Sequence, residues 1–127
     1  MKLLDTNILL EILLGQKRAE VAKAYINAQD AGSLFLSSYS LDSIGLKLFW
    51  AGKIDAIGQI GLDIAASGIG VLTLSPEDFG EIAKNISKWG LDFDDAYQYT
   101  VAKKRGLSIV SFDADFDKTD LVRIEPR

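Results

Sequence analysis

Short runs of apolar residues alternate along this chain with longer stretches in which apolar residues recur at helical spacing. The short runs predict strands at residues 3–4, 34–36, 71–74, 109–110 and 121–124. The longer stretches predict helices at residues 7–14, 19–31, 38–50, 54–66, 76–86 and 94–105. Strands that alternate with helices are typical of α/β proteins, so this pattern predicts a three-layer α/β/α sandwich.

Particular residues mark the ends of the predicted helices. Ser38 or Ser40 is expected to cap the helix that ends near Trp50, because a serine hydroxyl accepts a hydrogen bond from a free backbone N–H. Gly32 is a natural stop for the helix before it. The helix at 54–66 is expected to carry one apolar face, formed by Ile54, Ile57, Gly61 and Ile64.

The composition limits the chemistry that this chain can perform. With 127 residues, 48% of them hydrophobic and 25% charged, the chain is expected to form a single globular domain over residues 1–127. It has no cysteine and no histidine, which excludes disulfides, thiolate zinc sites and imidazole catalysis. Any bound metal must therefore be a hard cation held by oxygen, such as magnesium, manganese or calcium.

Charge and hydropathy limit the binding partners and the cellular location that are expected for this protein. The net charge of −4 argues against simple electrostatic binding of nucleic acid, although divalent cations can bridge an acidic pocket to phosphate. The apolar stretch up to Leu14 is interrupted by Asp5 and Glu11 and has no small-residue cleavage site, so a signal peptide is not expected. No run reaches the roughly 20 apolar residues of a membrane span, and a cytoplasmic protein is expected.

Acidic residues follow the predicted strands at several points. Asp5 ends the first apolar run, Asp113 follows the run at 107–111, and Asp94 and Asp95 begin the helix between them. Open parallel sheets bind ligands beyond the carboxyl ends of their strands. If the first and fourth strands are neighbours, Asp5 and Asp113 emerge side by side, with Asp95 facing the same crevice. Because like charges repel, this convergence predicts a metal site.

Each of these acids also has a purely structural interpretation. Asp5 could simply cap the following helix, and Asp94 or Asp95 could serve only the dipole of its own helix. Asp113 could be an ordinary turn aspartate. The combination of acids at one sheet edge favours a site over coincidence.

Other acidic motifs fit the chain less well. Residues 113–117 resemble the start of a calcium loop, but Lys118 stands where that loop requires glycine. A phosphoacceptor signalling domain would need paired acids after the first strand, where this chain has only Asp5. A haloacid-dehalogenase phosphatase would need an aspartate at the position of Asn7.

Three segments in register resemble one family. Residues 1–10, Met-Lys-Leu-Leu-Asp-Thr-Asn-Ile-Leu-Leu, resemble the opening of a PIN domain, the metal-dependent ribonuclease fold of VapC-type toxins. Residues 91–96 resemble the acid that precedes a long helix in that family, and residues 111–116 resemble its Thr-x-Asp-x-x-Phe segment. The resemblance implies a mainly parallel five-stranded sheet in the order 3-2-1-4-5. It also implies one or two Mg²⁺ or Mn²⁺ ions and water-driven cleavage of RNA phosphodiesters.

The resemblance also assigns residues. It makes Asp5, Asp95 and Asp113 the catalytic metal ligands and Asp115 an outer candidate, with Asn7, Ser111 and Asp94 in support. The family places a glutamate in the helix after the second strand, where this chain has Ser43. Asp42, one residue earlier and about 100° around the helix, is a candidate replacement.

Two hypotheses follow. The leading hypothesis is a metal-dependent ribonuclease that cleaves RNA, the toxin of a toxin–antitoxin pair, with an antitoxin protein as partner, a homodimeric assembly and no membrane association. The missing glutamate motivates the alternative, a degenerate, non-catalytic PIN-like module that binds RNA or protein.

Overall fold

A computed structural model describes residues 1–127. Five short strands form one sheet in the order β3-β2-β1-β4-β5, and every neighbouring pair is parallel. The strands are β1 Lys2–Leu4, β2 Leu34–Ser37, β3 Gly70–Leu72, β4 Ser108–Val110 and β5 Arg123–Ile124. The predicted α/β class and the strand order implied by the family resemblance are both confirmed.

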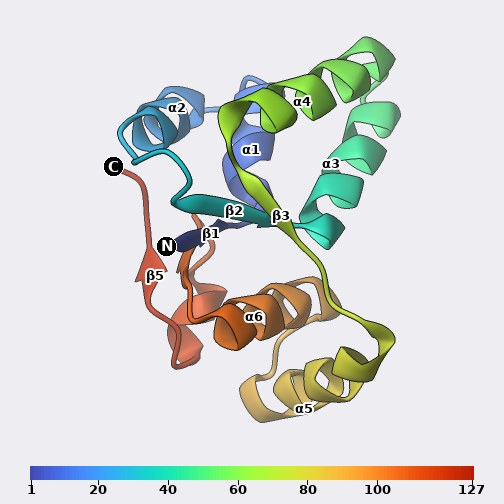
Figure 1. Cartoon of the computed structure of the whole chain (residues 1–127), viewed down its shortest axis with the longest axis vertical. Helices are drawn as coiled ribbons and strands as arrows, with labels where there is room; N and C mark the ends of the chain where they lie inside the picture. Colours follow the sequence, from blue (N-terminus) through green and yellow to red (C-terminus); the bar gives the residue numbers. More distant parts are fainter.

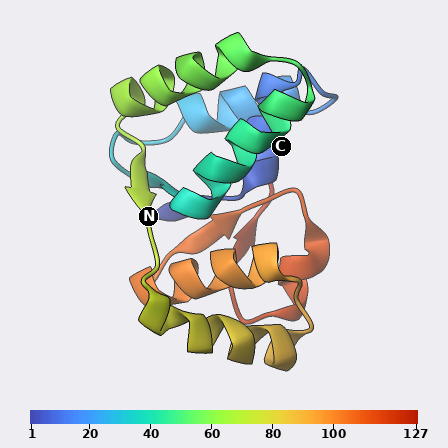
Figure 2. The same cartoon turned by 90° about the vertical axis from the view of Figure 1, so that its right-hand side faces the viewer.

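Helices cover both faces of the sheet (Figure 1). They are α1 Thr6–Leu13, α2 Ala19–Asn27, α3 Ser38–Trp50, α4 Ile54–Ser67, α5 Phe79–Trp89 and α6 Phe93–Arg105. Short 3₁₀ helices span Pro76–Asp78 and Ala114–Lys118. The first four helices lie on one side of the sheet and α5 and α6 on the other, which Figure 2 shows from a second direction. No helix is both long enough and apolar enough to span a membrane.

The strands divide the core into two clusters by simple alternation. Leu4 and Val110 belong to the cluster under α1–α4, whereas Leu3 and Ile109 belong to the cluster under α5 and α6. Successive residues of a strand point to opposite faces, and both faces are covered here. This is why the consecutive residues Leu3 and Leu4 of β1, and Ile109 and Val110 of β4, are all apolar.

The pairing of β1 with β4 sets up one edge of the sheet. Leu4 lies opposite Val110, and the backbone N–H of Asp5 donates to the carbonyl oxygen of Val110 over 2.9 Å. The chain therefore leaves β1 at Asp5 beside the point where it leaves β4. The conditional prediction that these two strands are neighbours is confirmed.

Several element boundaries differ from the sequence predictions. Ser37, rather than Ser38 or Ser40, caps α3, because β2 runs directly into the helix and the Ser37 hydroxyl accepts from the N–H of Ser40 over 3.0 Å. On α4, Ile54 is 64% exposed and Ile60 is buried instead. The apolar face of α4 is thus rotated from the predicted one.

The predicted bounds of the second helix and the third strand are also wrong. The second helix ends at Asn27 rather than continuing to 31, and Gly32 follows in a left-handed conformation with a φ of +77°. The third strand begins at Gly70 and ends at Leu72, so residues 73–74 lie outside it. A Cβ at Gly70 would lie only 2.7 Å from Cδ1 of Phe35, its partner on β2, so any larger residue there would force the Phe35 ring to move.

Candidate metal centre

A hollow of about 240 Å³ opens beyond the carboxyl ends of β1 and β4. Its lining comes from the segment after β1, from one face of α3, from the start of α6 and from the segment after β4. The lining residues are Asp5, Thr6, Asn7, Leu10, Ser43, Lys47, Asp92, Asp94, Asp95, Gln98 and Asp113. We call this hollow the acidic pocket, because five of its side chains are carboxylates and only one is a cation.

Asp5 both caps a helix and lines the pocket. One carboxylate oxygen accepts from the N–H of Thr6 over 2.7 Å, and the other accepts from the Ser111 hydroxyl over 2.6 Å. Burial raises the pKa of Asp5 to about 6, although these two hydrogen bonds act in the opposite direction. The neighbouring charges of Asp113 and Asp92 raise the pKa further. The capping and site interpretations of Asp5 are therefore compatible.

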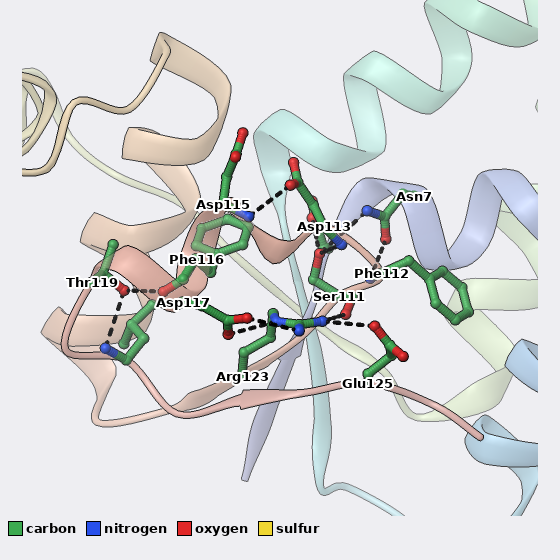
Figure 3. Close-up of polar contacts among 12 residues, drawn as sticks. Asn7, Ser111, Phe112, Asp113, Asp115, Phe116, Asp117, Thr119, Arg123 and Glu125 are labelled. Atoms are coloured by element: carbon green, nitrogen blue, oxygen red, sulfur yellow. Dashed lines mark hydrogen bonds and ion pairs between the residues drawn. The ribbon is translucent and has the colours of Figure 1, made fainter.

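Ser111 connects the two strand ends. Its buried hydroxyl accepts from the Asp113 backbone N–H over 2.9 Å and from the Asn7 side chain over 3.2 Å, besides donating to Asp5. Asn7 in turn accepts from the backbone N–H of Phe112 over 3.3 Å. In Figure 3, the Asn7 side chain and the Asp113 backbone meet at Ser111, whereas the Asp113 carboxylate points toward Asp115. This network fixes the segment after β4 against the start of α1.

Arg123 on β5 holds the same segment from outside the pocket. Its guanidinium donates to the carbonyl oxygen of Ser111 over 3.0 Å and forms ion pairs with Asp117 and Glu125 on either side (Figure 3). The arginine thus connects the edge strand and the 3₁₀ helix to the residue that orients Asp5. None of these contacts was predicted from the sequence.

Asp92 and Asp95 lie in the first turn of α6. Asp92 is the N-cap, and its carboxylate accepts from the Asp95 backbone N–H over 2.9 Å. The Asp95 side chain, in contrast, accepts no hydrogen bond from the protein and pairs with no cation, although the residue is only 9% exposed. Burial raises its pKa to about 7, with further contributions from the charges of Asp92, Asp5, Asp113 and Asp115.

Three carboxylates come within the span of a single ion. One oxygen from each of Asp95, Asp113 and Asp115 lies within 4.8 Å of the other two. Asp113 caps the 3₁₀ helix at Ala114–Lys118 by accepting from the Asp115 N–H over 2.8 Å, which brings the last two acids together. Asp5 lies outside this trio but lines the same pocket. The prediction that Asp5, Asp95 and Asp113 converge at one edge therefore agrees with where the structure places them.

The donor set suits a hard divalent cation. All candidate donors are carboxylate, amide or hydroxyl oxygens, which Mg²⁺ and Mn²⁺ prefer. Burial, together with the charges of the neighbouring acids, raises the pKa values of Asp5 and Asp95, so ionising both without positive charge nearby is costly. A cation bound among these acids would remove that cost.

Of the two other acids predicted for the site, Asp94 lies in the acidic pocket and Asp42 does not. Asp94 lines the pocket, but its carboxylate accepts a hydrogen bond from the Tyr39 hydroxyl, so it is turned toward α3. Asp42 does not join the acids: it lines a different depression, together with Ile57 and Ile60. Ser43, the next residue on α3, faces the acidic pocket in its place.

Sequence reasoning missed two kinds of residue in the pocket. The first is Asp92, whose spacing from Asp95 is that of an N-cap and the third helical residue, a signal that was available. The second is a group of polar side chains behind the acids. Thr6 and Ser40 share a hydrogen bond of 2.7 Å, and Gln98 donates to both hydroxyls. No local sequence signal joins residues so far apart.

Comparison with known proteins finds one protein family whose model matches this chain. The family model described as PIN domain matches residues 2–122. A search of curated protein sequences finds no match.

Solved structures of similar fold cover almost the whole chain. The sarcin-ricin-loop-cleaving toxin VapC20 of Mycobacterium tuberculosis superposes with a TM-score of 0.79 at 17% identity, over 99% of this chain and 100% of the toxin chain. A chain of a toxin–antitoxin complex from Klebsiella pneumoniae gives 0.70 at 19% identity, over 91% and 90%. A chain of VapBC2 from Rickettsia felis, bound to promoter DNA, gives 0.72 at 16% identity, over 99% and 98%. At these identities the likeness concerns the fold.

Proposed function

This chain belongs to the PIN domain family, and we propose that its acidic pocket hydrolyses RNA phosphodiester bonds with the aid of a bound divalent cation. Members of this family are generally nucleases. The substrate class and the metal dependence are the two parts of the proposal that go beyond family membership.

The single observation that supports the proposal most strongly is the environment of Asp95. Its nearly buried carboxylate has neither a hydrogen-bond donor nor a protein cation, and it lies close to Asp113 and Asp115. A protein that only needed a stable helix start would not require a buried carboxylate for it, because Asp92 already caps α6 and the exposed Asp94 already places an acid in its first turn. Perturbed acids clustered in a hollow are typical of functional sites.

The residues divide into three roles under this proposal. Asp95, Asp113 and Asp115 would hold Mg²⁺ or Mn²⁺, and when bound the ion would polarise the phosphodiester and favour deprotonation of an attacking water. Asp5 faces the same space from β1 and would complete the oxygen donor set. Ser111 and Asn7 hold Asp5 and the backbone of Asp113 in place, so that the acids need not rearrange.

A toxin role with an antitoxin partner is part of the same proposal. The Klebsiella pneumoniae neighbour is described as a toxin–antitoxin complex and the Mycobacterium tuberculosis neighbour as a toxin that cleaves the sarcin-ricin loop. We propose that an antitoxin segment covers the acidic pocket of this chain and that the chain forms a homodimer.

A second function has one observation in its favour. α3 contributes no carboxylate to the pocket, because Ser43 faces it and Asp42 does not. A chain with too few ligands would retain the fold and bind RNA or protein without catalysis.

RNA cleavage distinguishes the two functions. Purified protein is incubated with labelled RNA in Mn²⁺, in Mg²⁺ and in EDTA, alongside Asp113→Asn and the control Asp42→Asn. The nuclease proposal expects metal-dependent cleavage that Asp113→Asn abolishes and Asp42→Asn retains. Cleavage that persists unchanged in Asp113→Asn, or in EDTA, would rule it out, and absence of cleavage under every condition would favour the non-catalytic module.

A further inference from the structure

Most basic side chains of this protein are already engaged. Of the 14 lysines and arginines, six form ion pairs with acids: Arg18, Lys23, Lys84, Lys103, Lys104 and Arg123. Lys118 donates to a backbone carbonyl, and Lys2 and Lys88 lie over aromatic rings. Among the cations without such contacts, only Lys47 lines the acidic pocket.

Lys47 belongs to a wall of the pocket that carries no acid. It follows Ser43 by one turn of α3, so the two side chains lie on the same face of the helix and both line the pocket. The carboxylates come from the other elements, after β1 and β4 and at the start of α6. Although five acids share this pocket, Lys47 forms an ion pair with none of them.

An unpaired ammonium opposite a carboxylate cluster has a particular use. A phosphodiester is an anion, and five carboxylates repel it unless positive charge in the pocket offsets theirs. A metal held by the acids supplies charge on one side. Lys47 is the only basic side chain that lines the pocket, and it comes from the wall that carries no acid.

We propose that Lys47 binds a phosphate of the RNA strand across the pocket from the acids, as a positioning residue for the substrate. This inference rests on the proposed nuclease function and deepens it. Lysine acts on phosphate as a flexible point charge. The contact would therefore strengthen binding of RNA of any sequence and would leave base preference to other residues.

Lys47 also has a structural role that the test must separate. It lies in the last turn of α3, where a cation interacts favourably with the helix dipole. That role predicts a small loss of stability when the charge is removed, and it predicts no change in RNA or metal affinity.

The test compares Lys47→Met and Lys47→Arg with Lys53→Met. Lys53 is exposed and unpaired, and it lies outside the pocket, just before α4. Binding of a labelled, mixed-sequence single-stranded RNA is measured by fluorescence anisotropy in Ca²⁺ at several salt concentrations. Calorimetry measures Mn²⁺ affinity without RNA, and RNA cleavage by the wild type in Mn²⁺ is recorded in parallel.

The proposal expects Lys47→Met to weaken binding of RNA but not of Mn²⁺. Lys47→Met should weaken RNA binding by about tenfold and reduce the slope of log affinity against log salt by about 0.7, the value for one phosphate contact to a single strand. Its Mn²⁺ affinity should stay equal or rise, because a nearby positive charge is lost. Lys47→Arg and Lys53→Met should both stay close to the wild type in RNA affinity.

Three results would overturn the inference, and they differ from one another. If Lys47→Met binds RNA as Lys53→Met does while the wild type still cleaves RNA, Lys47 has no phosphate role and the proposed function stands. If Lys47→Met loses RNA and Mn²⁺ together, the residue only supports the fold of the pocket. If the wild type neither binds nor cleaves RNA, the proposed function fails, and the inference fails with it.

Discussion

The two walls of the acidic pocket differ in both chemistry and origin. One wall gathers Asp5, Asp95 and Asp113 from three separate elements, and two of these acids have strongly raised pKa values. The opposite wall comes from a single helix, α3, and offers a hydroxyl and an ammonium group, Ser43 and Lys47. The two walls line the same pocket and differ in charge, yet no ion pair joins them.

The two walls also differ in how much electrostatic repulsion the fold must offset. The acidic wall is held by backbone geometry, because Asp5, Asp92 and Asp113 each cap the helix that follows them. Capping stabilises the local structure and offsets part of the repulsion among the acids. The α3 wall contains no acid, so no repulsion between carboxylates has to be offset there. We therefore expect changes on the two walls to act in opposite directions.

The largest effect is expected from Asp95→Asn on the acidic wall. Because a bound ion contributes several kcal/mol to such a reaction, RNA cleavage should fall by at least about a hundredfold. The metal-free protein should at the same time melt a few degrees higher at neutral pH, because the change removes a buried charge without a partner. Calorimetric melting and a cleavage assay check the two signs. A variant that is both less stable and less active would indicate a structural defect instead.

An acid placed on the α3 wall would remove the difference in chemistry between the two walls. Ser43→Glu should tighten Mn²⁺ binding by about tenfold, because it adds a carboxylate donor to the same pocket. The metal-free variant should be less stable than the wild type, since one more charge joins the repulsive cluster. Calorimetry on this variant and on Ser43→Gln separates charge from side-chain size. Equal affinities in the two variants would show that α3 does not reach the ion.

The stability of the metal-free protein should depend on pH in two windows. Burial raises the pKa of Asp5 to about 6 and that of Asp95 to about 7, so the folded state holds protons that the unfolded chain has already released. Stability should therefore fall as pH rises from about 4 to about 7, by a few degrees in melting temperature. At more acidic pH the trend reverses, because the hydrogen bond from Arg123 lowers the pKa of Asp117.

Added metal tests the origin of the first window. Saturating Mn²⁺ should restore the stability that is lost at neutral pH, since the ion binds the ionised acids of the folded state. Melting curves across pH, with and without Mn²⁺, give the result directly. A metal-free protein that becomes steadily more stable up to neutral pH would contradict the assignment.

The smallest effect is expected from Asp42→Asn. Asp42 is exposed and lines a different depression from the acids, so cleavage and Mn²⁺ affinity should both stay within about twofold of the wild type. The same measurements as for Asp95→Asn apply. A loss as large as that of Asp95→Asn would mean that α3 rotates to bring Asp42 into the pocket.

Part of this site could be predicted from sequence because strand ends carry a local signal. A short apolar run that stops at an acid places that acid at the carboxyl edge of a parallel sheet, and both Asp5 and Asp113 lie there. Asp95 was placed correctly by its position in the first helical turn. The α/β class followed from the same alternation of strands and helices.

The remainder depended on rotations and long-range contacts. On α3, one residue separates Asp42 from Ser43, and only the packing of the helix decides which of them faces the pocket. The start of α6 was predicted at residue 94 instead of Phe93, which concealed the capping role of Asp92. Lys47 resembles an ordinary lysine near a helix end, and nothing local relates it to acids far away in the sequence.

A calorimetric titration with Mn²⁺ decides whether the acidic pocket is a metal centre. It compares the wild type with Asp95→Asn, and Asp42→Asn serves as the matched control. We predict saturable binding to the wild type and to Asp42→Asn, and no binding to Asp95→Asn. Equal binding to Asp95→Asn, or no binding to the wild type at millimolar Mn²⁺, would contradict the assignment of this pocket as a metal centre.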